Sequence, residues 1–419
     1  MRYFFCAPAI ILFVLSAVNT AAQKLPSDSA KWKEDHLPHD HPLVAYAPVQ
    51  TPDRITIVPA GNTIDSLFFC WRSDTAANES VLEIGPARGL SFPKKSIKKI
   101  KGTSRVLSTA QYPSRYHKAL VTGLQDGVTY QYRVGASPYW SKWMLYECRK
   151  KQDTVRLLYF GDAQNKIYES TSKIYTSAAK AWDKAQLTIH TGDLINHANN
   201  DYEWAEWHAA SALLNQSIPI LAAPGNHEYV KNKEGHKTDL TDFWEYTFPN
   251  KTEWVGGPWF FDYGPVRFIL LNSSREIHKE KTWLEEVLSH TKQPWVVLAF
   301  HHPIFSGARN RQNKGIQENW LPLIEKYKDK IGLVLQGHDH TYARGGLAGR
   351  SGTVQHPSSP VFTVTVTGTK RYELEKQSWM DVSYPDVSSY QYIEITGNKI
   401  TYQSFSETGV LIDQFELTK

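Results

Sequence analysis

The sequence has little cysteine, little net charge and only one long apolar run. Three of its 419 residues are cysteine, and the formal net charge is +5. A charge this small gives no reason to expect a nucleic-acid partner. No internal repeat and no low-complexity linker interrupts the chain. Because a domain usually has about 100–200 residues, these features predict a globular protein of two domains or three.

The one long apolar run lies at the N-terminus. It extends from Tyr3 to Val18, follows Arg2 and leads into small residues up to Ala22. A membrane-spanning helix needs about 20 apolar residues, so this shorter run with a cleavable end predicts a secretory signal peptide over residues 1–22. We therefore expect a secreted or periplasmic protein that has no transmembrane segment after cleavage. Residues 23–52 would form an N-terminal lead-in.

Removal of the signal peptide takes away Cys6 and leaves Cys70 and Cys148. In an exported protein these two residues are able to stay oxidised, so one disulfide is one interpretation. Two buried thiols that pack as small hydrophobic groups are the other, because a sequence does not give the distance between them. Neither cysteine lies near the motifs described below, so neither is a candidate catalytic residue.

Residues 53–150 carry the pattern of an all-β domain. Short alternating runs, such as Asp65–Arg72 and Tyr116–Thr122, are separated by Gly and Pro at turn positions. The segment Gly123–Gly135, GLQDGVTYQYRVG, resembles the stretch before and along one strand of fibronectin type III domains, where a Tyr hydroxyl pins the corner between strands. This resemblance implies a fibronectin type III-like sandwich with Trp71 in its core.

The pattern changes after Asp153. Apolar runs alternate with amphipathic stretches of helical period, which predicts an α/β domain over residues 153–419. The expected strands are Val155–Phe160, Leu187–His190, Ile218–Ala222, Phe268–Leu271, Trp295–Phe300 and Gly332–Leu335. The expected helices are Tyr168–Lys184, Tyr202–Asn215, Glu280–His290 and Ile316–Tyr327.

A β pattern returns beyond His340. The runs are Pro360–Thr367, Tyr390–Thr396, Lys399–Phe405 and Val410–Leu417. We expect these strands to complete the second domain, and a small module of their own is the alternative. The segment Gly368–Tyr384 is expected to be a loop near the pocket that helps to select the substrate.

Clusters of polar residues follow five of the predicted buried strands. They are Gly161-Asp162-Ala163-Gln164, Gly192-Asp193-Leu194-Ile195-Asn196, Gly225-Asn226-His227-Glu228, His301-His302-Pro303 and Gly337-His338-Asp339-His340. In α/β sheets the site lies beyond the carboxyl ends of the strands, so these clusters should meet in one crevice. Glycine there permits backbone angles and close approaches that a side chain would block. So many carboxylate, amide and imidazole ligands suit a pair of ions held ~3.5–4 Å apart, such as iron, zinc or manganese.

The order of these motifs resembles that of the calcineurin-like metallophosphoesterases and, within them, the purple acid phosphatases. The resemblance covers Val155 to about Tyr342. A fibronectin-like N-terminal domain and a signal peptide both fit the plant-type purple acid phosphatases. The resemblance implies a four-layer αββα metallophosphoesterase sandwich behind the all-β domain, with two metal ions, from among Fe, Zn and Mn, that serve phosphate-ester hydrolysis.

The resemblance also implies a role for each motif residue. The ligands of the first metal would be Asp162, Asp193 and His340, and Asp193 would bridge to the second metal. The remaining ligands of the second metal would be Asn226, His301 and His338. His227 would bind the phosphate and protonate the leaving alcohol while a metal-bound hydroxide attacks phosphorus. The residue types support this role, because a His beside a ligand Asn lies within reach of the ester and has a pKa in the useful range.

Two positions depart from the purple acid phosphatase pattern. The Tyr that binds ferric iron, three residues after the bridging Asp, is replaced by Asn196, and a Gly two residues after the first Asp is replaced by Gln164. Both residues are possible metal ligands, and orientation of a bound water is the alternative role. Because the tyrosinate is missing, we expect divalent metals or a mixed pair and a colourless protein.

Several further residues have two interpretations. His302 either lines the pocket or supports and packs against the ligands, and Arg309 and Arg311 are candidates for sharing the charge that develops on the phosphoryl group. The segment Asn199–Trp207, with Trp254 and Trp259, forms either an aromatic wall of the pocket or core, and core is favoured. The N-terminal histidines His36, His39 and His41 are expected to belong to a solvated lead-in.

The expected function is hydrolysis of phosphate monoesters by a secreted, acid phosphatase-like enzyme whose partner is a small-molecule phosphate ester. The alternative enzyme is a phosphodiesterase that acts on nucleotide or sugar-linked phosphodiesters, because the same metal pair handles both classes of ester. A non-catalytic binding or adhesion protein is the alternative of another class. Competent residues at all six ligand positions argue against that last alternative. The sequence predicts no oligomeric state.

Overall fold

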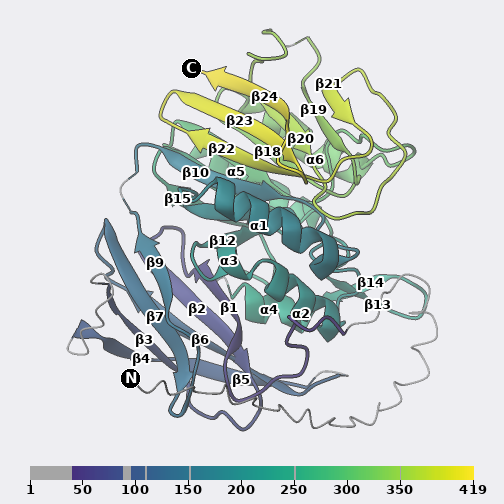
Figure 1. The fold of residues 1–419 in the computed structure, drawn as a ribbon. Coiled ribbons are helices and arrows are strands. Elements are labelled where there is room, and N and C mark those ends of the chain that lie inside the picture. The colour runs from purple at the N-terminus through teal and green to yellow at the C-terminus, as the bar shows by residue number, and fades with distance from the viewer. Residues whose placement is uncertain (1–39, 88–95, 109–110, 151, 250–251, 350) are drawn as a thin grey trace, which may run out of the picture. The chain divides into compact units, whose positions relative to one another are not determined.

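The computed structural model describes residues 40–419 except 88–95, 109–110, 151, 250–251 and 350 (Figure 1). The predicted signal peptide and most of the lead-in, with His36 and His39, lie outside the described residues. Residues 40–419 belong to one compact unit. No helix in this part of the chain is both long enough and apolar enough to cross a lipid bilayer.

The N-terminal part of this unit is an all-β sandwich of two antiparallel sheets. One sheet has the strand order β1-β2-β6-β5, and the other has β4-β3-β7-β8 with β9 also paired to β7. The strands are β1 Asp53–Pro59, β2 Ser66–Ser73, β3 Val81–Pro86, β4 Lys98–Lys101, β5 Thr103–Leu107, β6 Ser114–Thr122, β7 Val128–Ala136, β8 Tyr139–Trp140 and β9 Met144–Cys148. Apolar side chains from both sheets fill the space between them.

A tyrosine hydroxyl holds the turn that leads into β7. The hydroxyl of Tyr130 accepts a hydrogen bond from the backbone N–H of Gln125 at 2.9 Å, which is the bond that the sequence pattern predicts. Trp71 is 1% exposed within the core. Its ring stacks on that of His117, with the ring centroids 5.1 Å apart.

The two described cysteines are free and buried. Cys70 lies on β2 and Cys148 on β9, in different sheets of the sandwich. Burial raises the pKa of the Cys70 thiol to about 12, so this thiol is unreactive at neutral pH. Of the two interpretations of the sequence, the structure has the buried thiols.

The C-terminal part of the unit has two sheets packed face to face, with helices on their outer sides (Figure 1). The strand orders are β12-β11-β10-β22-β23-β24 and β15-β16-β17-β18-β20-β19-β21. The strands of the first sheet are β10 Val155–Phe160, β11 Leu187–His190, β12 Ile220–Ala222, β22 Ser389–Ile395, β23 Lys399–Ser406 and β24 Leu411–Thr418. Those of the second are β15 Trp259–Tyr263, β16 Val266–Leu270, β17 Trp295–Ala299, β18 Ile331–Gln336, β19 Tyr342–Gly346, β20 Val361–Val364 and β21 Met380–Tyr384.

The helices form the two outer layers. A π-helical turn, Ile167–Thr171, leads into α1 Ser172–Ala181, and α2 Asp201–Ala210, α3 Ala212–Asn215 and α4 Asp242–Thr247 pack on the same sheet. Helices α5 Ile277–Ser289 and α6 Lys314–Lys326 pack on the other sheet. Strand β10 is apolar on both faces because Leu157 faces the second sheet and Leu158 faces the helices. The predicted αββα architecture behind an all-β region is confirmed.

Some elements are absent from the sequence-based prediction. The hairpin of β13 Tyr229–Lys231 and β14 Lys237–Leu240 was not predicted, nor were β15, β19 and α4. The segment Gly368–Tyr384, expected to be a loop throughout, ends in the edge strand β21. The strands after residue 341 extend both sheets, as expected, and do not form a separate module.

A buried ion network fixes the β-sandwich against α2. Arg54 Nη1 lies 2.6 Å from Asp201 Oδ1, and Arg72 Nη1 lies 3.7 Å from Asp201 Oδ2. The side chains of these three residues are at most 2% exposed. Arg72 also donates to both carboxylate oxygens of Asp53, at 2.8 and 2.5 Å. The sandwich is therefore attached to the α/β region by charges that have no access to water.

Candidate metal centre

The five polar motifs follow β10, β11, β12, β17 and β18 and meet where these strands end. The first three strands belong to one sheet and the last two to the other. The site therefore lies where the carboxyl ends of strands from both sheets meet. Contacts across this junction show the meeting directly. Asp162 Oδ1 lies 3.4 Å from His340 Nε2, and Asp193 Oδ2 lies 3.1 Å from His301 Nε2.

One group of candidate ligands consists of Asp162, Asp193 and His340. Their ligand atoms lie within 4.8 Å of one another, and each residue is at most 1% exposed. Asp162 Oδ2 accepts the backbone N–H of His338 at 2.7 Å, while Asp162 Oδ1 is buried and has no hydrogen-bond partner. An unsatisfied buried carboxylate oxygen that faces an imidazole nitrogen fits a cation between them.

A second group consists of His301, His302 and His338, whose ligand atoms also lie within 4.8 Å of one another. Asn226 joins this group, because its Oδ1 lies 3.2 Å from His301 Nε2. His301 Nδ1 lies 2.8 Å from the carbonyl oxygen of Thr191, an arrangement that directs Nε2 toward the site. The structure thus brings all six predicted ligands together, with Asp193 at the boundary of the two groups.

The two optional ligands lie differently. The Gln164 amide lies among the ligands, with Nε2 2.9 Å from His340 Nε2 and 3.2 Å from Asp193 Oδ2, and its Oε1 is buried without a partner. A flip of this amide would place an oxygen at the position that a metal requires. Asn196 contributes main-chain contacts instead, since its carbonyl oxygen accepts a hydrogen bond from His227 Nδ1 at 2.5 Å.

The backbone of the site is strained at the candidate ligands. Asp162, Asp193, His338 and His340 all have positive φ, at 29°, 52°, 72° and 51°. Such conformations are unfavourable for residues with a side chain and concentrate at functional sites. Glycine supplies the room: a Cβ on Gly337 would lie 2.2 Å from Asp162 Oδ2, and one on Gly225 would lie 2.2 Å from Asp193 Oδ1. The motif glycines therefore permit close approach, as predicted.

Glu228 is a supporting residue that sequence reasoning left without a role. Its buried carboxylate accepts the backbone N–H groups of Asp193, Leu194 and Gly225 at 2.7–2.9 Å. These bonds hold the loop after β11, which contains Asp193, against the loop after β12. The only sequence signal for this role was the position of Glu228 at the end of the Gly-Asn-His-Glu motif. Its partners are main-chain groups, which every residue has, so no pattern of residue types identifies them.

The charges within the site explain why it suits cations. Burial raises the pKa of Asp162, and the nearby Asp193 carboxylate adds to that effect. Burial also acts to raise the pKa of Asp193, but His301 and His227 outweigh it and hold that pKa well below its usual range. Two carboxylates in one buried site repel each other, and a multivalent cation between them removes the repulsion.

Comparison with known proteins assigns the chain to a family. Residues 155–342 match the family described as calcineurin-like phosphoesterase, and residues 52–147 match the family described as purple acid phosphatase, N-terminal domain. Residues 155–342 therefore form a calcineurin-like phosphoesterase domain, and residues 52–147 form a purple acid phosphatase N-terminal domain.

The relatives of this chain are distant. Human acid phosphatase type 7 is 24% identical over 257 residues, 54% of this chain and 56% of that protein. The Arabidopsis thaliana Fe(3+)-Zn(2+) purple acid phosphatase 12 is 24% identical over 278 residues, 60% and 57% of the two chains. The chain thus spans just over half the length of these relatives. Purple acid phosphatase PPD1 from yellow lupin seeds has the same fold as this chain. The two structures match with a TM-score of 0.75 and 17% identity, over 88% of this chain and 74% of that chain.

Two arginines of this chain, both candidates from the sequence, have different surroundings. Arg309 forms an exposed ion pair with Glu373 at 2.8 Å. Arg311 instead contacts His338 Nε2 and lies 3.5 Å from Asp339 Oδ1, with its side chain 28% exposed. Only Arg311 therefore lies at the metal centre. His302, left open by the sequence, is 9% exposed and bonds through Nδ1 to Ser273 Oγ at 2.9 Å.

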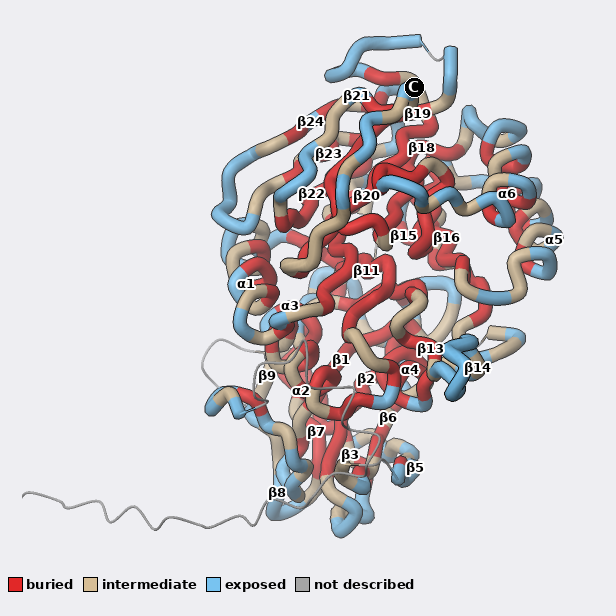
Figure 2. The backbone as a smooth tube through the Cα atoms, turned by 90° about the vertical axis from the view of Figure 1, so that its right-hand side faces the viewer, coloured by how far each residue is buried: buried red, intermediate tan, exposed pale blue. Residues whose placement is uncertain are grey.

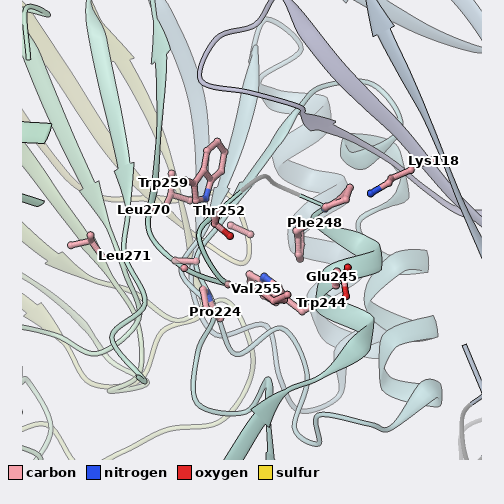
Figure 3. A pocket seen from close by; sticks show the side chains of 15 residues that line it. Lys118, Pro224, Trp244, Glu245, Phe248, Thr252, Val255, Trp259, Leu270 and Leu271 are labelled. Atoms are coloured by element: carbon pink, nitrogen blue, oxygen red, sulfur yellow. The ribbon is translucent and has the colours of Figure 1, made fainter. Parts of the chain in front are cut away.

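The tryptophans divide between core and pockets. Trp204 and Trp207 on α2 are completely buried, which confirms the core interpretation for them. Trp259 is 7% exposed and also belongs to the core, and it lines a pocket of about 260 Å³ with Trp244 of α4 and with Phe248, which follows α4 (Figure 3). This pocket contains none of the candidate ligands, although Pro224 in its wall comes two residues before Asn226.

Proposed function

We propose that this chain hydrolyses phosphate monoesters with the help of two metal ions. One observation carries the proposal: two compact groups of candidate ligands meet at Asp193, where the family places a bridging residue. The names of the relatives, acid phosphatase type 7 and purple acid phosphatase 12, agree with this activity. A phosphate monoester is therefore the first substrate class to test.

The residues present fit a metal pair. Asp162, Asp193 and His340, joined by Gln164, would hold one ion, and Asn226, His301 and His338 would hold the other with Asp193 shared. The buried, unpaired Asp162 Oδ1 and Gln164 Oε1 are the atoms that most require such an ion. When bound, a metal pair activates water and neutralises the charge of the phosphoryl group. Iron, zinc and manganese suit these oxygen and imidazole ligands.

His227 is positioned to protonate the leaving alcohol. Its Nδ1 donates to the carbonyl oxygen of Asn196, which fixes the ring and leaves Nε2 directed toward the site, 4.0 Å from Asp193 Oδ2. Burial lowers the pKa of His227, and the charge of Asp193 opposes this effect. A bound phosphate dianion would counteract this lowering of the pKa, and the protonated ring would then carry on Nε2 the proton that the alkoxide needs.

The test is hydrolysis of 4-nitrophenyl phosphate and bis(4-nitrophenyl) phosphate by metal-reconstituted protein. We expect the monoester to be the better substrate. Asp193→Asn should lower kcat/KM at least a hundredfold together with metal content, and His227→Ala should lower kcat by about 10²–10⁴-fold with metal content unchanged. Asp183→Asn and His278→Ala, both at exposed positions, are matched controls.

Each outcome of this assay is informative. A better diester substrate would identify a phosphodiesterase instead. Two bound metals without hydrolysis of either ester would contradict the proposal and favour a binding or adhesion protein.

We also propose that the protein is exported to the periplasm or the medium. The support is the sequence of residues 1–22 alone, a charged residue, an apolar run and a small-residue end. N-terminal sequencing of protein recovered from periplasm or medium should begin at Gln23. Full-length protein that retains Met1 in the cytosol would contradict export.

A further inference from the structure

Two lysines face each other on the hairpin that follows the Gly-Asn-His-Glu motif. The register of β13 and β14 pairs Lys231 directly with Lys237. Like charges opposite each other weaken a strand pair. Among the described residues no carboxylate forms an ion pair with either ammonium group. The hairpin lies at the surface, where its residues are largely exposed (Figure 2). These charges are therefore uncompensated within the described chain.

Two further cations approach the site from other loops. The carbonyl oxygen of Lys370 lies 3.2 Å from His340 Nδ1, and the Lys370 ammonium lies 5.3 Å from the centroid of the Tyr372 ring. The Arg311 guanidinium lies 4.3 Å from the same centroid, and the Tyr372 ring lies 4.7 Å from that of His340. Tyr372 thus holds both cations beside a candidate metal ligand. We call Lys231, Lys237, Arg311 and Lys370 the cationic rim.

The rim lies next to the residue proposed to bind phosphate. Lys231 comes four residues after His227 and faces Lys237 across the hairpin. Arg311 contacts His338 Nε2, and the carbonyl oxygen of Lys370 lies 3.2 Å from His340 Nδ1. The four cations therefore come from three separate segments, each of which adjoins or contacts a candidate site residue.

The charge of the site shows what the rim is suited for. Asp162 and Asp193 are the two carboxylates of the proposed ligand set, and two divalent cations exceed their charge by two. A phosphate dianion balances that excess. Lys231, Lys237 and Lys370 then have no ion-pair partner among the described residues, whereas Arg311 lies 3.5 Å from Asp339 Oδ1. Cations held near one another without counter-charges are a binding site for further negative charge.

We propose that the cationic rim binds a second anionic group of the substrate. The preferred substrate is then a phosphate monoester whose leaving group carries another phosphate or a carboxylate. This inference rests on the proposed function, since it specifies the substrate class of the same site.

The experiment compares matched substrates on the metal-reconstituted full chain. One pair is 3-phosphoglycerate and glycerol 3-phosphate, and the other is fructose 1,6-bisphosphate and fructose 6-phosphate. Hydrolysis is measured as the release of inorganic phosphate. We expect kcat/KM to be at least tenfold higher for the more anionic member of one pair or both. The preference should shrink to less than threefold in Lys231→Gln/Lys237→Gln and in Lys370→Gln. It should also weaken when salt rises from 50 to 500 mM, because screening shortens the reach of exposed charges.

Arg309→Gln is the matched control. Arg309 lies on the same loop as Arg311, but its charge is already paired with Glu373, so the preference should persist in this variant. Equal kcat/KM values within both pairs would overturn the proposal that the rim binds a second anionic group, and the proposed function would still hold. If none of these esters is hydrolysed, the proposed function fails, and calorimetric Kd values for the same pairs decide the inference. Tenfold tighter binding of the more anionic member, lost in the lysine variants, supports the rim, and equal binding overturns it.

Discussion

At the scale of single residues, Asn196 is the reason why we expect the metal-loaded protein to be colourless. The position that holds an iron-binding tyrosine in purple acid phosphatases offers an amide here, and its main-chain oxygen is used to hold His227. Without a phenolate ligand we expect reconstituted protein to show no strong visible absorption band, and metal analysis to find divalent ions or a mixed pair. Asn196→Tyr loaded with ferric iron should become coloured. A strong charge-transfer band in the native protein would contradict the assignment.

His117 predicts a pH dependence of stability. Its ring stacks on Trp71, and its two nitrogens lie 2.8 Å from Ser73 Oγ and Ser80 Oγ. Burial lowers its pKa to about 3, whereas an exposed histidine has a pKa of about 6.5. Between these values the unfolded chain binds a proton that the folded chain does not, so the free energy of unfolding falls as the pH falls. The loss amounts to about 1 kcal/mol between pH 7.5 and 5.5 for this residue.

Urea unfolding of the protein at these two pH values measures the effect. Buried His190, whose pKa is also lowered to about 3, adds a similar loss. In His117→Gln the pH dependence should be smaller by about 1 kcal/mol, because the glutamine does not titrate. An unchanged pH dependence in this variant would show that His117 is already charged in the folded protein.

At the scale of elements, the buried strands were readable because they are apolar on both faces. The predicted limits of Val155–Phe160 and Leu187–His190 coincide with β10 and β11. The β13–β14 hairpin was missed because it is short, exposed and rich in lysine, so its sequence shows no apolar alternation. The loop after β20 ends in the edge strand β21 because residues Met380–Tyr384 pair with β19, a partner that no local pattern specifies.

The site was predictable to a similar extent. Residues that can bind a metal are chemically recognisable, and the six candidates chosen from their place after buried strands lie together in the structure. Supporting residues such as Glu228 and Arg311 act through contacts with groups distant in the sequence. The division between Arg309 and Arg311 depends on where Glu373 lies, which requires the fold.

The turn after β18 provides a direct test of the ligand geometry. A Cβ on Gly337 would meet Asp162 Oδ2 at 2.2 Å, so Gly337→Ala must displace either the loop or the carboxylate. We expect loss of at least one metal ion per chain, measured by elemental analysis after dialysis. Gly397→Ala, where a Cβ would meet nothing within 4 Å, should keep both metals. Full metal content in Gly337→Ala would show that Asp162 is not held as described.

At the scale of the whole molecule, the buried ion network fixes the sandwich to the α/β region. Asp201→Ala would leave Arg54 without a carboxylate and weaken the surroundings of Arg72, both inaccessible to water. Loss of one partner of a buried ion pair costs about 3 kcal/mol or more. Urea unfolding of the metal-free protein should show this decrease. Glu285→Ala, which removes an exposed pair with Lys326, should leave the stability almost unchanged.

The sheet order also has a consequence for synthesis of the chain. Strand β10, which leads to Asp162, pairs with β11 on one side and with β22 on the other. Strand β22 contains residues 389–395, so the ribosome makes it long after every candidate ligand. The loop with Asp162 also contacts the segment that precedes β22 in the sequence, because the Gly368 N–H donates to the Asp162 carbonyl oxygen. A nascent chain therefore contains all the candidate ligands before it can hold them in place, and the site is fully supported only after residues 389–395 have been made.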